Sequence, residues 1–275
     1  HTRYIGDWSS DVCSSDLSSI QSGFDNPRNV TGNPLAGIDP NEIVDTRPYT
    51  TKLQNFLTNN CEGNSEYSNL PRKWNTAVAG SKDNFLLHND IVFHPVENNG
   101  VMGFSIWIGG ILSPQMNAYA FPMNVWVLPD EICNIMDAVI RLWRDNGERE
   151  KRTKGRFRMY LDEIGHEEFR SQVEKLYGTL APDPGSTFEN SPRSHFGINQ
   201  QKQDGLYFAG IHIPVGRLTA EDLQDIATAS LNYGSGEIRL TEDQNIIITG
   251  LTTNKVEELK ADALLERFPL APSNI

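Results

Sequence analysis

The chain has 275 residues, a formal net charge of −12 at pH 7 and three cysteines. This length suffices for one large domain or two small ones, and the acidic balance argues against non-specific binding to nucleic acid or anionic membranes. Cys13 lies in the N-terminal segment that is set aside below, and Cys61 and Cys133 are far apart. They give no disulfide framework and no metal-binding pair, which favours a reducing compartment. No apolar run is long enough for a transmembrane helix.

The first 17 residues, HTRYIGDWSSDVCSSDL, lack apolar periodicity, a cationic n-region and an apolar h-region. They therefore match neither a signal peptide nor a membrane span. They match the in-frame translation of a common sequencing adapter. We interpret residues 1–17 as an adapter-derived, disordered artefact and exclude them from the fold; the alternative is a disordered serine-rich tail.

The next part of the chain divides into an irregular segment and a mixed region. Residues 18–47 are rich in Gly, Asn and Pro, which predicts a turn-dense segment. Residues 48–180 mix strands and helices. Within them, 90–96 and 101–108 are predicted strands joined by a hairpin with an Asn-Gly turn signal. Residues 129–145 have apolar side chains at helical spacing and predict a helix that ends at an Asn-Gly pair.

A Pro- and Ser-rich linker is predicted at residues 181–193, and a regular pattern follows it. Thr219 is the expected N-cap of a helix, with Asp222 as the third helical residue. The order is β-α-β-β-α, which predicts a small ferredoxin-like α+β sandwich. Its elements are strands 206–215, 237–240 and 245–249 and helices 219–234 and 253–268.

The segment LPRKWNTAVAG, residues 70–80, places two cations at the start of an apolar stretch. Burying cations is costly unless an anion meets them. In a strand, Lys73 and Asn75 point to the same face, because side chains alternate with period two. The segment predicts a pocket for a small anion or a carboxylate-bearing ligand; the alternative is a surface loop that leads into a core strand.

Five cations lie between Lys151 and Arg158. A solvated face is the favoured interpretation of this basic segment. Recognition of carboxylates and docking of an acidic partner are the functional alternatives. The histidines have no metal-ligand spacing, and the sequence contains no Gly-rich phosphate loop.

Four segments resemble the nitrite and sulfite reductase family. NPRNVTGNPLAGIDP (26–40), LPRKWNTAVAG (70–80) and DNFLLHNDIVFHPV (83–96) are similar to its first sirohaem-binding lobe. TEDQNIIITG (241–250), within residues 194–272, is similar to its second ferredoxin-like repeat. The resemblance implies an α+β fold: a sirohaem-binding domain at 18–180, the linker, and a ferredoxin-like half-domain at 194–275.

Within this family the chain is most like the ferredoxin-dependent nitrite reductases of cyanobacteria and plastids. That resemblance implies an oxidoreductase of nitrate assimilation that reduces nitrite to ammonium at sirohaem. Ferredoxin would be the electron donor, and a 4Fe-4S cluster would pass the electrons to sirohaem. The enzyme would be in the cyanobacterial cytoplasm or the plastid stroma. Neither nucleic acid nor membrane is an expected partner.

The resemblance also assigns roles to four residues. Arg28 matches an arginine on the distal face of sirohaem, where the anion binds. Arg72 matches a residue near the macrocycle carboxylates, and Lys73 matches the active-site lysine. Asn75 lies where nitrite reductases tend to carry asparagine and sulfite reductases a second lysine. Arg28, Lys73 and Asn75 are therefore the expected catalytic residues, and Arg28, Arg72 and Lys73 the expected cofactor-binding residues.

The chain departs from the family in its cysteines. Family members hold the cluster with four cysteines, and none of those motifs is present, so no metal ligand is expected in this chain. We therefore expect a fragment that is inactive by itself, with the cluster ligands and another ferredoxin-like repeat outside it. The alternatives are a fragment of an assimilatory sulfite reductase, disfavoured by Asn75, and a non-catalytic ferredoxin-like binding module.

Overall fold

The computed structural model describes residues 23–81, 85–188 and 195–271. The predicted adapter-derived segment lies outside these residues. Contacts divide the described chain into two compact units. The larger unit contains residues 23–36, 43–81 and 85–188, and the smaller unit contains residues 37–42 and 195–271. The predicted domain limits at 180 and 194 stay a prediction.

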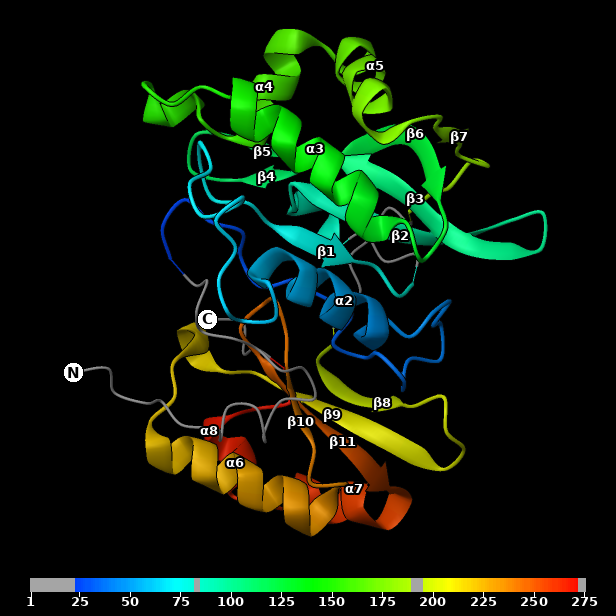
Figure 1. Cartoon of the computed structure of the whole chain (residues 1–275). Helices are drawn as coiled ribbons and strands as arrows, with labels where there is room; N and C mark the ends of the chain where they lie inside the picture. Colours follow the sequence, from blue (N-terminus) through cyan, green and yellow to red (C-terminus); the bar gives the residue numbers. More distant parts are fainter. Residues whose placement is uncertain (1–22, 82–84, 189–194, 272–275) are drawn as a thin grey trace. The chain divides into compact units, whose positions relative to one another are not determined.

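The larger unit is built on a five-stranded sheet (Figure 1). Its strand order is β1-β2-β3-β6-β7, with β1 parallel to β2 and the other pairs antiparallel. The strands are β1 (Thr76–Val78), β2 (Ile91–Asn98), β3 (Val101–Ile108), β6 (Phe121–Val127) and β7 (Ala181–Pro182). The predicted hairpin is confirmed: Asn99 and Gly100 join β2 to β3 with φ angles of 52° and 82°, which a tight hairpin turn requires.

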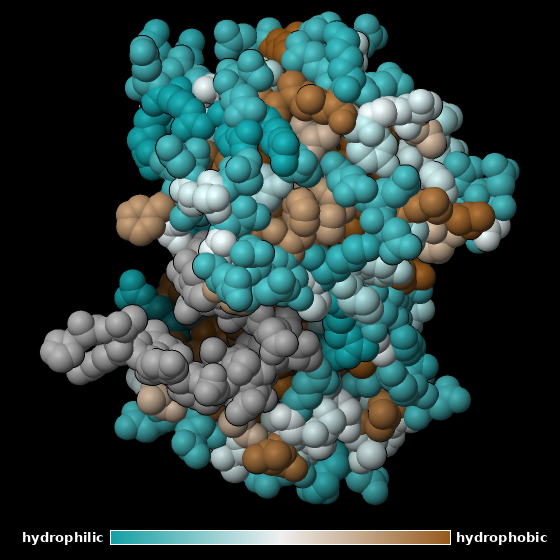
Figure 2. Space-filling model, viewed as in Figure 1, coloured by the Kyte–Doolittle hydropathy of each residue, from teal (hydrophilic) through white to brown (hydrophobic). Residues whose placement is uncertain are grey.

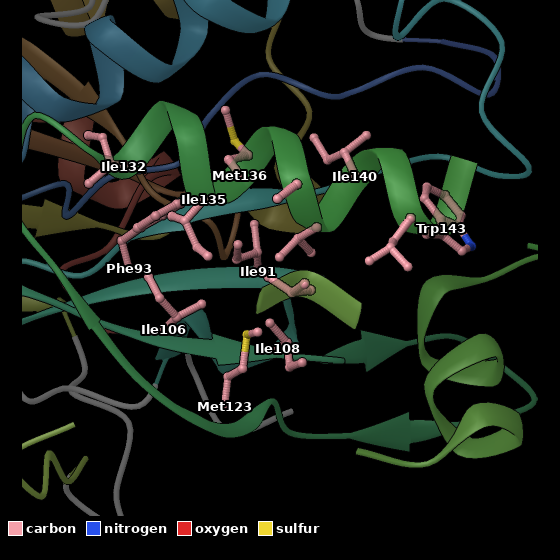
Figure 3. Packing of buried hydrophobic residues seen from close by; sticks show 14 of the residues in the cluster. Ile91, Phe93, Ile106, Ile108, Met123, Ile132, Ile135, Met136, Ile140 and Trp143 are labelled. Carbon is pink, nitrogen blue, oxygen red and sulfur yellow. The ribbon is translucent and has the colours of Figure 1, made fainter. Parts of the chain in front are cut away.

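The described part of this unit contains four α-helices. They are α2 (Arg47–Thr58), α3 (Ile132–Asn146), α4 (Phe157–Ile164) and α5 (His166–Tyr177). The predicted helix at 129–145 is confirmed as α3, although it begins three residues later. Figure 3 shows its apolar side lying along the sheet. Ile132, Met136 and Trp143 from the helix and Phe93 and Ile106 from the strands are all completely buried, which fixes α3 on this face.

The remaining elements of the larger unit are short. They are η2 (Phe85–His88), β4 (Ile111–Leu112), β5 (Asn117–Ala118) and η3 (Arg152–Lys154). Residues 23–46 contain turns, bends and isolated bridges, as predicted from their Gly, Asn and Pro content. Ala181 and Pro182, at the start of the predicted linker, pair with β6, so regular structure extends two residues into it. On the face seen in Figure 2, the surface over α4 and α5 is mainly hydrophilic.

The smaller unit contains a four-stranded antiparallel sheet in the order β10-β11-β9-β8. The predicted β-α-β-β-α order is confirmed by β9, α6, β10, β11 and α7. The elements are β8 (Gly197–Gln200), β9 (Leu206–Ile211), η4 (Pro214–Gly216), α6 (Ala220–Tyr233), β10 (Ile238–Leu240), β11 (Ile246–Thr252), α7 (Thr253–Lys260) and α8 (Leu264–Arg267).

The smaller unit differs from the prediction in several elements, and β11 runs three residues beyond the strand expected at 245–249. β8 was not expected, and it occupies the edge position that the fourth strand takes in a ferredoxin-like sheet. The strand expected at 206–215 ends at Ile211, because a turn with a left-handed Val215 follows (φ 50°). The helix expected at 253–268 is interrupted at residues 261–263. The predicted cap is confirmed: Thr219 and Asp222 form a complete capping box at the start of α6.

Within the described ranges, no helix is both long and apolar enough to span a membrane.

Candidate anion-binding site

Two segments that are distant in the sequence lie side by side in the larger unit. Residues 27–31 run parallel to residues 74–77, with bridges Pro27–Trp74 and Thr31–Ala77. The backbone N–H of Arg28 donates to the carbonyl oxygen of Trp74 at 2.7 Å. This pairing places the PRNVTG and RKWNTAV motifs next to each other, so the sequence-predicted Arg28, Lys73 and Asn75 come together in one region.

Trp74 anchors this region in the core. Its side chain is completely buried, its ring centroid is 5.5 Å from that of Trp143 and 4.9 Å from that of Phe157, and its Nε1 donates to Thr76 Oγ1. Lys73 and Asn75 flank Trp74 and remain partly exposed. Since side chains alternate in an extended segment, burying Trp74 turns both of its neighbours to the opposite side.

Asn75 is bound to a buried carboxylate. The parallel pairing of Thr76 with Ile91 places the preceding residues, Asn75 and Asp90, next to each other. The backbone N–H and the side-chain Nδ2 of Asn75 both donate to Asp90 Oδ2 at 2.8 Å. Arg156, at the start of α4, donates from Nη2 to Asp90 Oδ1 at 3.1 Å. Burial raises the pKa of Asp90, and the interactions with Arg156 and Asn75 act in the opposite direction.

Lys73 is the cation of this region that has no counter-ion of its own. Its ammonium group forms no hydrogen bond or ion pair with any residue in the described ranges. Burial lowers the pKa of Lys73 below its ordinary value. The nearby guanidinium groups of Arg156, Arg28 and Arg72 lower this pKa further. The carboxylate of Asp90 opposes this effect. An anion beside Lys73 would relieve this repulsion.

Arg72 has a counter-ion in the protein. Its Nη1 donates to Asp25 Oδ1 at 3.2 Å, and Arg152 binds the same carboxylate through two hydrogen bonds of 2.7 and 3.2 Å. Burial opposes ionisation of Asp25, but the two arginines outweigh it and lower the pKa of the carboxyl. Arg72 therefore lies near Lys73 but is held by Asp25, so it is less available to a ligand carboxylate.

The basic segment 151–158 does not form one solvated face. Lys151 and Lys154 are exposed, as that interpretation predicted. Arg156 is buried on Asp90, and Arg158 binds Asp162 and the carbonyl oxygens of Gly109 and Tyr119. Two of these cations contribute to the region around Lys73: Arg156 through Asp90, and Arg152 through the Asp25 carboxylate that holds Arg72.

The donor set matches a ligand that carries several carboxylates. Arg156 is 8% exposed, and its Nε is buried without a hydrogen-bond acceptor. Together with the uncompensated ammonium of Lys73, this group can bind a further anion, and guanidinium and ammonium groups are the usual partners of carboxylates. The region therefore fits the carboxylate-rich rim of sirohaem.

An iron–sulfur cluster needs a different ligand set. Three cysteines occur in the whole sequence, fewer than the four thiolates that a 4Fe-4S cluster takes. Within the described ranges, no group of three or more His, Cys, Asp or Glu side chains is arranged to hold a metal ion.

Comparison with known families decides the identity of the fold. The model of the nitrite and sulphite reductase 4Fe-4S domain matches residues 23–179, and that of the nitrite/sulfite reductase ferredoxin-like half domain matches residues 199–265. The chain belongs to the nitrite and sulfite reductase family.

Relatives of this chain include chloroplastic ferredoxin–nitrite reductase of Arabidopsis thaliana. The two are 45% identical over 94% of this chain and 45% of the relative. The ferredoxin–nitrite reductase of Synechococcus elongatus is 43% identical over 94% of this chain and 51% of the relative. The solved structure of Mycobacterium tuberculosis NirA superposes with a TM-score of 0.80 at 28% identity, over 90% of this chain and 45% of NirA. The chain spans about half the length of the curated relatives it matches.

The sequence predicted the cations of the candidate site, but it did not predict the residues that hydrogen-bond to its side chains. Asp90 was assigned only to the start of a predicted strand, and Arg156 only to a basic run. The link between Asp90 and Asn75 depends on the pairing of β1 with β2, which has no local signal in the sequence. The functional roles of Arg28, Arg72, Lys73 and Asn75 stay predictions.

Proposed function

We propose that the chain is part of an assimilatory ferredoxin-dependent nitrite reductase, and that the region around Lys73 binds sirohaem carboxylates and nitrite. The observation that supports this function is the position of Lys73 among three arginines without a counter-ion of its own. A protein keeps such an arrangement, which costs stability, where a ligand supplies the missing negative charge.

Arg28 and Lys73 would bind the anion, and Arg28, Arg72 and Lys73 the macrocycle carboxylates. For this contact Arg72 would exchange its ion pair with Asp25 for a ligand carboxylate. When bound, sirohaem supplies the electron transfer that converts nitrite to ammonium. The protein supplies positive charge where negative charge accumulates during reduction, which stabilises the transition state. Because its pKa is lowered, the ammonium of Lys73 is also a stronger acid than an ordinary lysine, which suits it to donate protons to departing oxygens.

Asn75 would favour nitrite over sulfite. A neutral amide gives a lower positive potential than a lysine at the same position, and nitrite carries less charge than sulfite. We expect Asn75→Lys to raise the affinity for sulfite relative to nitrite in the sirohaem-loaded chain, measured by titrating the absorption spectrum with each anion. An unchanged ratio would remove this explanation of specificity.

Ferredoxin would supply the electrons, and the compartment would be the plastid stroma or the cyanobacterial cytoplasm, in line with the names and sources of the relatives. Because the sequence has too few cysteines for the 4Fe-4S cluster, we expect that the chain alone does not reduce nitrite with reduced ferredoxin. Ammonium production by the purified chain would contradict this.

Binding of a polycarboxylate macrocycle tests the proposed site directly. Uroporphyrin, a porphyrin with eight carboxylates, is a fluorescent probe that needs no iron or cluster. We expect the full chain to bind it, and Lys73→Gln and Arg28→Gln to weaken binding by about tenfold each, the loss expected for one charge-assisted contact. Lys175→Gln, on the exposed side of α5, is the matched control and should change nothing. Equal binding by all four proteins would refute the assignment.

A further inference from the structure

Asp90 is the one negatively charged side chain in contact with the proposed site that is completely buried within the described ranges. It accepts three hydrogen bonds, two from Asn75 and one from Arg156. Its backbone is fixed as well, because its carbonyl oxygen accepts from the N–H of Gly109 at 2.9 Å. A carboxylate held at both its backbone and its side chain is a rigid support for the groups that it binds.

Asp90 determines which atoms of Asn75 remain for a ligand. One N–H of the Asn75 amide is used by Asp90, and the amide cannot flip, because flipping would turn its oxygen toward the carboxylate. The Oδ1 atom receives no hydrogen bond from the described residues. Because only one of the two N–H groups of the amide is used by Asp90, Asn75 also holds its second N–H in a fixed orientation, where it can donate to an anion next to the ammonium of Lys73.

Asp90 also orients Arg156. Nη2 of the guanidinium donates to Asp90 Oδ1 at 3.1 Å, and this contact holds one end of the group. Its Nε is buried without an acceptor, so one donor of an almost completely buried cation is unused. A guanidinium group that is held at Nη2 and has an unused donor at Nε is suited to bind an anionic ligand.

We propose that Asp90 is a positioning residue of the anion site, which fixes the amide of Asn75 and the guanidinium of Arg156 for binding a carboxylate-bearing or small anionic ligand. This inference rests on the proposed function. It extends the site by two residues, Asp90 and Arg156, neither of which the motif comparison assigned.

The positioning role and a purely electrostatic role predict opposite effects. Asp90 is negative, so if it acted only through its charge, removing that charge would raise the local positive potential and strengthen anion binding. If Asp90 positions its partners, Asp90→Asn replaces one of its two acceptor oxygens with an NH₂ donor, so Arg156 and Asn75 can no longer both be held. Anion binding then weakens although the site has gained positive charge.

The experiment compares the full chain with Asp90→Asn and Arg156→Lys in uroporphyrin binding. We expect each change to weaken binding by about tenfold. Arg156→Lys keeps the charge but removes the planar fork, so it separates orientation from charge. Asp162→Asn makes the same chemical change in the exposed Arg158–Asp162 pair and serves as the matched control.

A second measurement does not depend on ligand binding. In amide NMR spectra of the full chain, the side-chain NH₂ protons of Asn75 should exchange slowly and resonate apart from those of solvated asparagines. Asp90→Asn should abolish both features, and Asp162→Asn should preserve them. If Asp90→Asn does not fold, this measurement can still be made, because the exchange rate of the Asn75 amide in the wild-type chain reports on its hydrogen bond to Asp90.

The outcomes separate the two proposals. If the wild-type chain does not bind uroporphyrin, the proposed function fails. If wild-type binding depends on Lys73 but Asp90→Asn binds equally or more tightly, the proposed function stands and the positioning role of Asp90 is overturned. Rapid exchange of the Asn75 amide in the wild-type chain would overturn it as well.

Discussion

Removing the carboxylate of Asp90 should destabilise the larger unit strongly. Asp90 is completely buried and the Arg156 side chain is 9% exposed, so Asp90→Leu leaves a buried cation without its partner. Breaking a buried ion pair in this way costs about 3–5 kcal/mol. Domains of this size are stable by roughly 5–15 kcal/mol, so the variant should lose a large part of its stability.

The double variant Asp90→Leu/Arg156→Met tests the reasoning behind this magnitude. It removes both charges and replaces them with apolar side chains, which is often neutral for a buried pair. We therefore expect the double variant to recover most of the stability lost by Asp90→Leu. The exposed pair supplies the control: Asp162→Ala should cost less than about 1 kcal/mol.

Urea unfolding followed by tryptophan fluorescence is the assay. Four of the five tryptophans lie in the larger unit, so the change in the signal reports mainly on that unit. The free energy of unfolding comes from the linear dependence on urea. The reasoning is refuted if Asp90→Leu costs no more than Asp162→Ala, or if the double variant is as unstable as the single one.

Four further predictions concern single residues. Lys73→Gln should stabilise the ligand-free chain by less than about 1 kcal/mol at pH 7, because the lowered pKa of Lys73 means that its charge disfavours the folded state, while solvent screens this partly exposed group. Urea titrations should show this gain vanishing as the pH rises above 10.5. Asp25→Asn should cost about 1 kcal/mol at pH 7, and this loss should fade as the pH falls below 3.8, since the depressed pKa of Asp25 stabilises the fold only while the group is ionised. Gly210→Ala should destabilise the smaller unit by about 3 kcal/mol in thermal circular dichroism, because a Cβ would lie 1.6 Å from the carbonyl oxygen of His195; an unchanged melting temperature would contradict that geometry. Thr219→Ala removes the capping box and should lower the stability of the same unit by about 1 kcal/mol, with helix content measured in the same experiment.

The predicted elements were most reliable where the signal is local. The hairpin at Asn99-Gly100 and the capping box at Thr219 were found because a few adjacent residues determine each of them. α3 was found because its apolar stripe is long. The predictions were wrong where a local pattern was interrupted: the strand from Leu206 ends at Ile211, and the last helix divides after Lys260.

β8 had no usable signal, because its four residues, GINQ, carry no clear alternation and depend on the neighbouring strand for their conformation. The basic segment was similarly ambiguous. Composition showed that its cations are clustered, but only the fold separated the buried Arg156 from the exposed Lys151 and Lys154.

The sequence by itself predicted an anion-binding motif, with Lys73 and Asn75 on the same face of an extended segment. It also predicted the ferredoxin-like order of the smaller unit. Both follow from residue types and periodicities that act over a few positions.

Only the tertiary structure decided how the motif is supported. It brought Arg28 beside Lys73, tied Arg72 to Asp25, and placed Asp90 between Asn75 and Arg156. These contacts join residues that are 15 to 66 positions apart. Their partners are chosen by the pairing of strands and by the cost of burying a charge without a counter-ion, and neither is specified by a local sequence pattern.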